Sequence, residues 1–484
     1  MNLNDQSLFR QQCYINGEWV NADSAETIDV NNPADNSIIG SIPKMGAEET
    51  RRAIECARVA QIKWRGMLAK ERAVILRKWH ELMMENQEDL AMLMTLEQGK
   101  PLAEARGEIA YASSFLEWFA DEGRRISGET IPQHQSDKRI VVIKQPVGVC
   151  VAITPWNFPA AMITRKVGPA LAAGCSVVVK PATQTPFSAL ALCELAERAG
   201  VPPGIISVVT GSAQGIGGEM TANPTVRHLS FTGSTEIGRL LMKQCSDSVM
   251  KVALELGGNA PFIVFDDADI DAAVEGAIIS KYRNAGQTCV CSNRIYVQAG
   301  VYKEFSEKLA QAVATMQVGN GTTEGVTQGP LIDMNAVEKV EEHIDDAVKK
   351  GAKVIVGGSR HELGGTYFQP TVMTNVSSTM KVATEETFGP LAPLFEFTDE
   401  TEVIRLANDT EFGLAAYFYS KDLARVWRVS EELEYGMVGI NTGLISTEVA
   451  PFGGVKQSGL GREGSTHGIE EYLEMKYLCM GGIE

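Results

Sequence analysis

The spacing of apolar and polar positions changes along the chain. From about residue 50, apolar residues recur every three or four positions, as in Ala53 to Trp64 and in the long run Glu71 to Gln98, and this spacing predicts helices. From Arg139 onward, short apolar runs alternate with helical stretches. We expect strands at residues 139–144, 149–154, 176–180, 206–210 and 228–232, and helices at residues 160–173, 185–199 and 235–244. Nearly continuous apolar strands between helices predict a parallel sheet that is covered on both faces, as in nucleotide-binding domains.

A second α/β series follows, and the chain ends in a different pattern. We expect strands at residues 261–265 and 294–297, and helices at residues 270–283, 302–313 and 336–350. From Ile469 to Met480, apolar and charged residues alternate, which predicts an exposed strand. With residues 139–144 it would form a small projecting sheet. Because an exposed strand edge needs a partner, we expect a homo-oligomer, either a dimer or a tetramer.

Composition and charge narrow the class of protein. A chain of 484 residues predicts two or three domains, and 44% hydrophobic with 22% charged residues is typical of a globular enzyme. A net charge of −17 argues against a nucleic acid or an anionic membrane as partner. No apolar run approaches the roughly 18 residues of a membrane span, and Met1 to Arg10 contain no apolar run. We therefore expect a cytoplasmic protein with a small-molecule substrate.

Cysteine and histidine usage excludes two kinds of chemistry. The nine cysteines are scattered and contain no Cys-x-x-Cys pair, which favours reduced thiols over a disulfide framework or a zinc site. The six histidines include no His-Glu-x-x-His motif, so we expect no metal site. None of them lies in a recognisable catalytic setting, which makes a Cys-His hydrolase a poor fit.

One thiol has an unusual setting. Cys289 lies in Asn284-Ala-Gly-Gln-Thr-Cys289-Val-Cys291, among small and polar residues rather than the apolar neighbours of a structural cysteine. A cysteine reacts as the thiolate, so it needs partial exposure and a nearby base or dipole. Glu255, in Glu255-Leu-Gly-Gly-Asn259, is the candidate base. The alternative for any single cysteine is a small buried apolar residue.

A glycine pattern follows the strand expected at residues 228–232. Phe231-Thr-Gly-Ser-Thr-Glu-Ile-Gly238 opens a helix, whose first backbone N–H groups could bind a pyrophosphate. Its glycine spacing is neither the usual Rossmann pattern nor a P-loop. By itself it also fits a helix that packs closely on a sheet, so other features must decide.

Seven ordered motifs supply those features. They are Thr154-Pro-Trp-Asn157-Phe-Pro, Val179-Lys180-Pro, Phe231-Thr-Gly-Ser-Thr235, Glu255-Leu-Gly-Gly258, Gly286-Gln-Thr-Cys289, Glu385-Glu386-Thr-Phe388-Gly-Pro390 and Pro451-Phe-Gly-Gly454. In this combination the whole chain resembles the aldehyde dehydrogenase superfamily, and within it the bacterial NADP-dependent succinate-semialdehyde dehydrogenase branch. The resemblance implies a Rossmann-like dinucleotide-binding domain (residues 1–124 and 146–256), an α/β catalytic domain (257–450) and a small β oligomerisation arm (125–145 and 451–484).

The resemblance also assigns the reacting groups. Cys289 would be the nucleophile that attacks the aldehyde, giving a thiohemiacetal and then a thioester. The side-chain amide of Asn157 and the backbone N–H of Cys289 would form the oxyanion hole, although Asn157 alone could equally be a turn residue after Pro155. Glu255 would activate water for hydrolysis of the thioester. A catalytically silent relative is less consistent with a chain that has all three residues, and a CoA-acylating relative tends to lack the Glu255-type base.

Cofactor roles carry over in the same way. Lys180 would bind the adenosine ribose, Glu386 the nicotinamide ribose and Ser234 the pyrophosphate, and the remaining cofactor contacts would be Trp156, Gly211, Gly233 and Phe388. Where many NAD-preferring members have Lys-Pro-x-Glu, this chain has Lys180-Pro-Ala-Thr183. A carboxylate at that position would repel a 2′-phosphate, so Thr183 favours NADP, with NAD still possible.

Substrate choice depends on three further positions. Arg165, Arg283 and Ser446 match the residues that hold the distal carboxylate in the succinate-semialdehyde branch, and arginine suits this task because its planar fork meets a carboxylate with two hydrogen bonds. The alternative is that both arginines pair with acidic residues of the fold. Glutarate semialdehyde, or ω-semialdehydes more broadly, remain the second substrate class. Cys291 could form a reversible disulfide with Cys289 as a redox switch, or could simply be a packed small residue.

Overall fold

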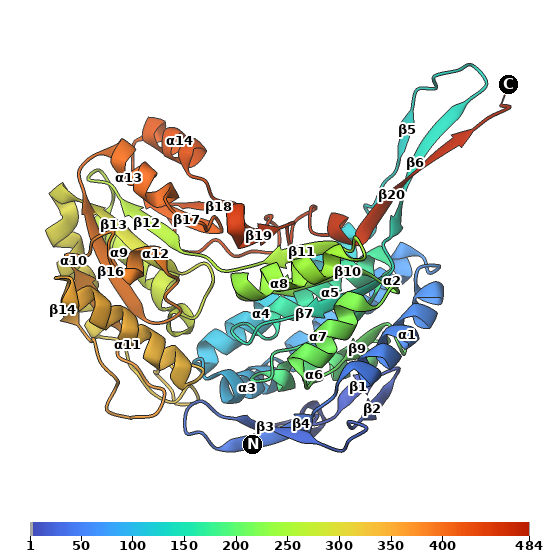
Figure 1. The fold of residues 1–484 in the computed structure, drawn as a ribbon, viewed down its shortest axis with the longest axis horizontal. Coiled ribbons are helices and arrows are strands. Elements are labelled where there is room, and N and C mark those ends of the chain that lie inside the picture. The colour runs from blue at the N-terminus through green and yellow to red at the C-terminus, as the bar shows by residue number, and fades with distance from the viewer. Residues whose placement is uncertain (1–2, 484) are drawn as a thin grey trace.

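The computed structural model describes residues 3–483 and contains two α/β lobes and a projecting arm (Figure 1). The first lobe is built on an eight-stranded sheet in the order β19-β11-β10-β7-β8-β9-β1-β2. Strands β11, β10, β7, β8 and β9 are parallel, and β19, β1 and β2 pair antiparallel at the two ends. The strands are β1 (Cys13–Ile15), β2 (Glu18–Val20), β7 (Val149–Ile153), β8 (Ser176–Lys180), β9 (Ile206–Val208), β10 (Val226–Thr232), β11 (Lys251–Glu255) and β19 (Gly459–Leu460).

Helices cover both faces of this sheet, as the apolar strands predicted. Along β8, Val177 and Val179 pack in one hydrophobic core while Val178 packs in the other, because successive side chains of a strand point to opposite faces. The helices are α1 (Ala47–Trp64), α2 (Ala69–Glu85), α3 (Gln87–Gln98), α4 (Leu102–Glu122), α5 (Ala161–Ala173), α6 (Pro186–Arg198), α7 (Ala213–Ala222) and α8 (Thr235–Ser246). A β3 (Thr27–Asn31) and β4 (Ile38–Pro43) hairpin lies beside them.

The second lobe holds a seven-stranded sheet in the order β14-β15-β16-β13-β12-β17-β18. All its pairings are parallel except that of β14 with β15. Its strands are β12 (Ala260–Val264), β13 (Ser292–Gln298), β14 (Lys353–Val356), β15 (Thr371–Thr374), β16 (Leu391–Phe397), β17 (Ala415–Tyr419) and β18 (Met437–Ile440). Its helices are α9 (Ile270–Tyr282), α10 (Ala299–Ala314), α11 (Met334–Lys349), α12 (Lys381–Thr384), α13 (Glu400–Asn408) and α14 (Leu423–Glu432).

The arm is a three-stranded antiparallel sheet in the order β20-β6-β5, made of β5 (Glu129–Ile131), β6 (Arg139–Pro146) and β20 (Leu473–Met480). It projects from the first lobe (Figure 1). The division that we expected placed all of residues 451–484 in the arm. Instead, β19 pairs with β11 in the eight-stranded sheet, so only the last part of that stretch builds the arm.

One local detail differs from the expected pattern. The apolar periodicity of residues 71–98 predicted one long helix, but α2 ends at Glu85 and α3 starts at Gln87. Asn86 separates them with φ −108° and ψ 20°, and its side-chain amide donates to the Leu82 carbonyl. Within residues 3–483, every helix is too short or too polar to cross a lipid bilayer.

Candidate active site

The site begins where three neighbouring strands of the first sheet end. Register pairs Ile153 of β7 with Phe231 of β10, and Thr232 of β10 with Glu255 of β11. Because these strands are parallel, the loops that follow them emerge at one edge of the sheet, where α/β proteins bind ligands. This arrangement brings the loops that contain Asn157 and Ser234 next to Glu255, the last residue of β11.

The second lobe supplies the thiol through a tight turn after α9. Gly286 has φ 74°, and a Cβ there would lie 2.1 Å from the Gly389 carbonyl oxygen. Facing this turn, a Cβ on Gly258 would lie 2.4 Å from the carbonyl oxygen of Cys289. Only glycine permits these approaches. The Glu255-Leu-Gly-Gly258 loop and the nucleophile loop are therefore packed backbone to backbone.

These loops enclose a cavity of about 210 Å³. Of the residues predicted from the sequence, the cavity is lined by Trp156, Asn157, Gly233, Ser234, Cys289, Glu386 and Phe388. The rings of Trp156 and Phe388 meet edge to face with centroids 5.6 Å apart. Ser234 caps α8 and accepts a hydrogen bond from the backbone of Ile237, so the positive end of a 12-residue helix opens at the cavity.

Burial sets the protonation of the thiol. It raises the pKa of Cys289 to about 12, and the nearby Arg165 guanidinium only partly opposes this effect. The sequence indicated that this thiol would need a nearby base. The raised pKa agrees with that expectation, because a protonated Cys289 needs a base to become a nucleophile.

Glu255 is placed as such a base would be. It is buried at the end of β11, and within residues 3–483 its Oε2 atom has no hydrogen-bond partner. Burial, and then the neighbouring Glu463 carboxylate, raise the pKa of Glu255 well above its ordinary value. A buried carboxyl with a raised pKa can exchange protons near neutral pH.

The two predicted substrate arginines differ in their surroundings. Arg165 on α5 is buried, forms an ion pair with Glu463 at 2.7 Å and lies over the ring of Phe452 at 3.8 Å. For Arg165, the structure therefore contains the ion pair with an acidic residue that we named as the alternative to substrate binding. Arg283 directly follows α9, is half-buried, and has its guanidinium 5.1 Å from the centroid of the Phe158 ring.

Ser446 and Cys291 are two further predicted site residues that do not line this cavity. Ser446 is half-buried in the loop between β18 and β19. Cys291 is 1% exposed, and its Sγ atom lies 3.6 Å from the Lys281 carbonyl oxygen as a donor. Cys289, in contrast, is partly exposed at the cavity, although its surroundings are buried enough to raise the pKa of the thiol.

Three predicted cofactor residues lie outside the cavity. Lys180 is buried at the end of β8, and Thr183 lines a separate hollow near the β3–β4 hairpin. Gly211 has φ 132°, and a Cβ there would meet the Met45 backbone nitrogen at 2.3 Å, so its glycine is needed for chain packing. Within the cavity, Glu386 accepts a hydrogen bond from the Gly258 N–H at 3.1 Å, and burial raises its pKa to about 7.

Several polar groups beside the site were not found from the sequence. Lys100 is buried in an ion pair with Glu108 at 2.5 Å and donates to the Asn157 carbonyl at 2.8 Å. The hydroxyl of Tyr111 on α4 is buried without a hydrogen-bond partner in the described part of the chain. Asn284 bonds to both site loops. Of these residues, only Asn284 could have been recognised from the sequence, because an asparagine before Ala-Gly tolerates the left-handed backbone of a tight turn.

Comparison with known proteins agrees with this geometry. The aldehyde dehydrogenase family pattern matches residues 19–478. The chain is 70% identical over 483 residues to the glutarate-semialdehyde dehydrogenase of Pseudomonas aeruginosa, covering 100% of both, and 69% identical over 481 residues to the NADP(+) succinate-semialdehyde dehydrogenase of Escherichia coli, covering 99% and 100%. A crystal structure of succinate-semialdehyde dehydrogenase from Burkholderia pseudomallei superposes with a TM-score of 0.99 at 65% identity, covering 99% of this chain and 100% of that one. The predicted fold class is confirmed, and the chain belongs to the aldehyde dehydrogenase family.

Proposed function

We propose that this enzyme oxidises succinate semialdehyde to succinate with NADP, accepting NAD less well. The observation that carries the proposal is one cavity that joins the Cys289 thiol to the Asn157 amide and to five of the predicted cofactor residues. Glu255 lies at the end of the adjoining strand β11, and its Oε2 atom has no hydrogen-bond partner among residues 3–483. The relatives named for succinate and glutarate semialdehydes support an aldehyde that ends in a carboxylate.

The reaction starts with proton transfer. Glu255 takes the thiol proton of Cys289, and the thiolate adds to the aldehyde carbon. The Asn157 amide and the Cys289 N–H then donate to the oxygen that becomes negative. A bound nicotinamide would accept the hydride that leaves this carbon. Glu255 gives the thiol proton up to solvent, then removes a proton from water as the water attacks the thioester. It returns that proton to the departing Cys289 sulfur, which leaves the carboxylic acid and the thiol.

The residues around the cavity fit a dinucleotide. Ser234 and the first turn of α8 present N–H groups and a positive dipole end to a pyrophosphate. Glu386 can accept hydrogen bonds from ribose hydroxyls, and Lys180 can donate to the other ribose. Thr183 replaces the carboxylate that would repel a 2′-phosphate, which supports NADP as the preferred cofactor.

Arg283 is the residue that we propose to hold the distal carboxylate. Its guanidinium is half-buried, and it stands six positions before the nucleophile in the sequence. Arg165 and Ser446 complete the proposed set, with Arg165 shared between Glu463 and the substrate. Glutarate semialdehyde is the second candidate because a relative with that name is 70% identical. One methylene changes binding by only about 1–3 kcal/mol, so both substrates need testing.

The deciding experiment measures reduced-cofactor formation by the purified protein. Succinate semialdehyde, glutarate semialdehyde and acetaldehyde are each paired with NADP and with NAD. We expect the highest kcat/KM for succinate semialdehyde with NADP. If acetaldehyde is the only aldehyde oxidised, the proposed recognition of a distal carboxylate is wrong. Equal kcat/KM values with NADP and NAD would contradict the proposed role of Thr183 in cofactor preference.

Three further proposals concern assembly, location and redox state. We propose a homo-oligomer in which the arm meets another subunit, because β20 is an edge strand with Met475 and Tyr477 exposed. The mass of the purified protein in solution tests whether it is a dimer, a tetramer or a monomer. The acidic charge and scattered cysteines support a cytoplasmic location.

We also propose a reversible Cys289–Cys291 disulfide. Peroxide would take two electrons and two protons from the thiols and become two waters. Inactivation by peroxide that dithiothreitol does not reverse would contradict it.

A further inference from the structure

The turn before the nucleophile is strained. Asn284 and Ala285, with φ values of 54° and 53°, precede Gly286 with φ 74°, so three consecutive residues adopt left-handed backbone. Asn284 and Ala285 are both buried. Left-handed backbone is unfavourable for a residue with a Cβ, and such strain persists only where surrounding contacts hold it.

The contacts that hold this turn converge on Asn284. Its Nδ2 atom donates to the Asn157 carbonyl at 3.0 Å and to the Gln287 carbonyl at 3.1 Å. Its Oδ1 atom accepts from the side chain of Gln98 at 2.9 Å, and its backbone N–H donates to Glu104 at 2.8 Å. One side chain therefore bonds to α3, to the loop after β7 and to the nucleophile loop.

One of these two carbonyls, that of Gln287, also holds the side-chain amide of Asn157. Its Nδ2 atom donates to the Gln287 carbonyl at 3.1 Å. An amide nitrogen carries two hydrogens, so this bond directs one of them to Gln287 and leaves the other for a substrate oxygen. The Asn157 carbonyl in turn accepts from both Asn284 and Lys100. Its backbone and its side chain are thus both tied to their neighbours.

We propose that Asn284 is a positioning residue of the oxyanion hole. It joins the backbone of Asn157, in the first lobe, to that of Gln287, in the second, and thereby sets the separation of the Asn157 amide from the Cys289 N–H. The inference rests on the oxyanion role proposed for those two donors. Positioning of this kind acts on kcat, because the donors must match the oxygen as it becomes charged.

Asn284→Gly removes the amide and keeps the left-handed backbone accessible. We expect kcat to fall about 10- to 100-fold. The KM for the aldehyde, the dissociation constant of NADP and the rate at which iodoacetamide alkylates Cys289 stay near those of the unmodified enzyme. Asn375→Gly is the matched control, because Asn375 is also left-handed, with φ 57°, but is exposed after β15. An unchanged kcat for Asn284→Gly would overturn the proposal.

A double-mutant cycle separates positioning from a general structural role. If Asn284 acts through Asn157, then Asn284→Gly lowers kcat little further once Asn157→Ala has been introduced. The full 10- to 100-fold loss in the Asn157→Ala background would show an independent role and overturn the proposal. If Asn284→Gly does not fold, Gln98→Met replaces it in the cycle. This variant removes the donor that orients the Asn284 amide, and it should give a smaller loss that also disappears in Asn157→Ala.

The cycle can be measured with any aldehyde that the unmodified enzyme oxidises. If the enzyme oxidises only uncharged aldehydes, the proposed substrate fails while the cycle remains measurable. If Asn157→Ala keeps full activity, the oxyanion role fails and the inference fails with it.

Discussion

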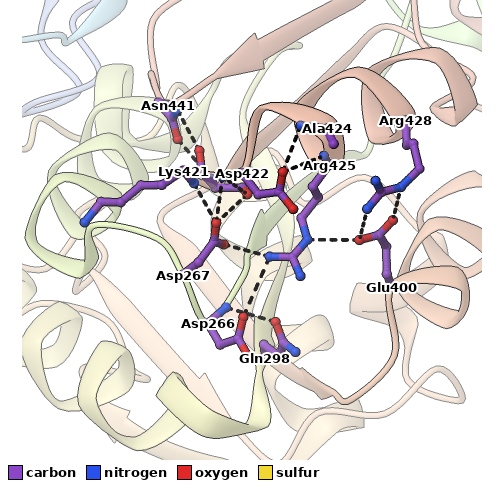
Figure 2. A network of polar contacts seen from close by, with 11 residues as sticks. Asp266, Asp267, Gln298, Glu400, Lys421, Asp422, Ala424, Arg425, Arg428 and Asn441 are labelled. Atoms are coloured by element: carbon purple, nitrogen blue, oxygen red, sulfur yellow. Dashed lines mark hydrogen bonds and ion pairs between the residues drawn. The ribbon is translucent and has the colours of Figure 1, made fainter.

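Two charged clusters in this enzyme are built differently. Around Arg425 on α14, the charges are saturated with partners (Figure 2). Arg425 pairs with Asp267 at 2.7 Å and Glu400 at 2.9 Å, and Asp267 also accepts from the Ser420 hydroxyl and from the backbone N–H groups of Lys421 and Asp422. These bonds join the loop after β12 to the start of α14.

The cluster at the active site lacks this saturation. Glu463 is shared between Arg165 and Lys166, while the Oε2 atom of Glu255 has no hydrogen-bond partner within the described residues. Burial therefore raises the pKa of Glu255. The difference teaches that paired charges hold elements of the fold together, whereas an underpaired buried carboxyl keeps a proton that it can exchange. The following predictions test this contrast.

The largest effect is expected at the thiol. Cys289→Ala should abolish aldehyde oxidation, because no nucleophile remains, while NADP still binds. Cys291→Ala is the matched control two residues away and should retain activity, since Cys291 is buried and is not among the residues that line the cavity. Steady-state assays and cofactor titration measure both. Substantial turnover by Cys289→Ala would contradict the mechanism.

Glu255→Gln should lower kcat about 10²- to 10⁴-fold. In the unmodified enzyme, a raised pKa keeps Glu255 protonated to higher pH, so kcat should fall as the pH falls through that pKa and level off above it. Glu255→Gln should lose this limb of the profile. Stopped-flow measurement of the reduced cofactor, with kcat against pH, tests it. A variant with the original pH profile would show that the titrating group lies elsewhere.

Arg283→Ala should raise the KM for succinate semialdehyde about 10- to 100-fold, because a charge-assisted hydrogen bond contributes about 1.5–3 kcal/mol. The KM for an uncharged aliphatic aldehyde should change little. Equal increases for both aldehydes would remove Arg283 from carboxylate binding.

The last comparison concerns stability. Arg165→Met leaves the buried Glu463 with Lys166 alone and should lower the free energy of unfolding by about 3–5 kcal/mol. Arg425→Met should cost about 1–2 kcal/mol, because its partners are partly exposed, and should leave activity unchanged. Chemical denaturation measures both. A greater loss for Arg425→Met would reverse the proposed contrast between the clusters.

Sequence reasoning succeeded where the signal was local. The strand at residues 176–180 was predicted with its observed bounds, because three consecutive valines follow a stretch with helical spacing. The break at Asn86 was missed because apolar spacing continues across it. The pairing of Arg165 with Glu463 and the contacts of Asn284 with Gln98 and Asn157 join distant parts of the chain, so no local pattern contained them. The seven motifs indicated the reacting residues, but not what holds them.

The high pKa of Cys289 has a consequence for the idle enzyme. Oxidants and alkylating metabolites attack the thiolate, and a protonated sulfur offers them a poor target. We therefore expect peroxide to close the proposed Cys289–Cys291 disulfide slowly, and only when the Cys289 proton has first been removed. On this reasoning, Cys289 becomes reactive only when Glu255 removes its proton during turnover.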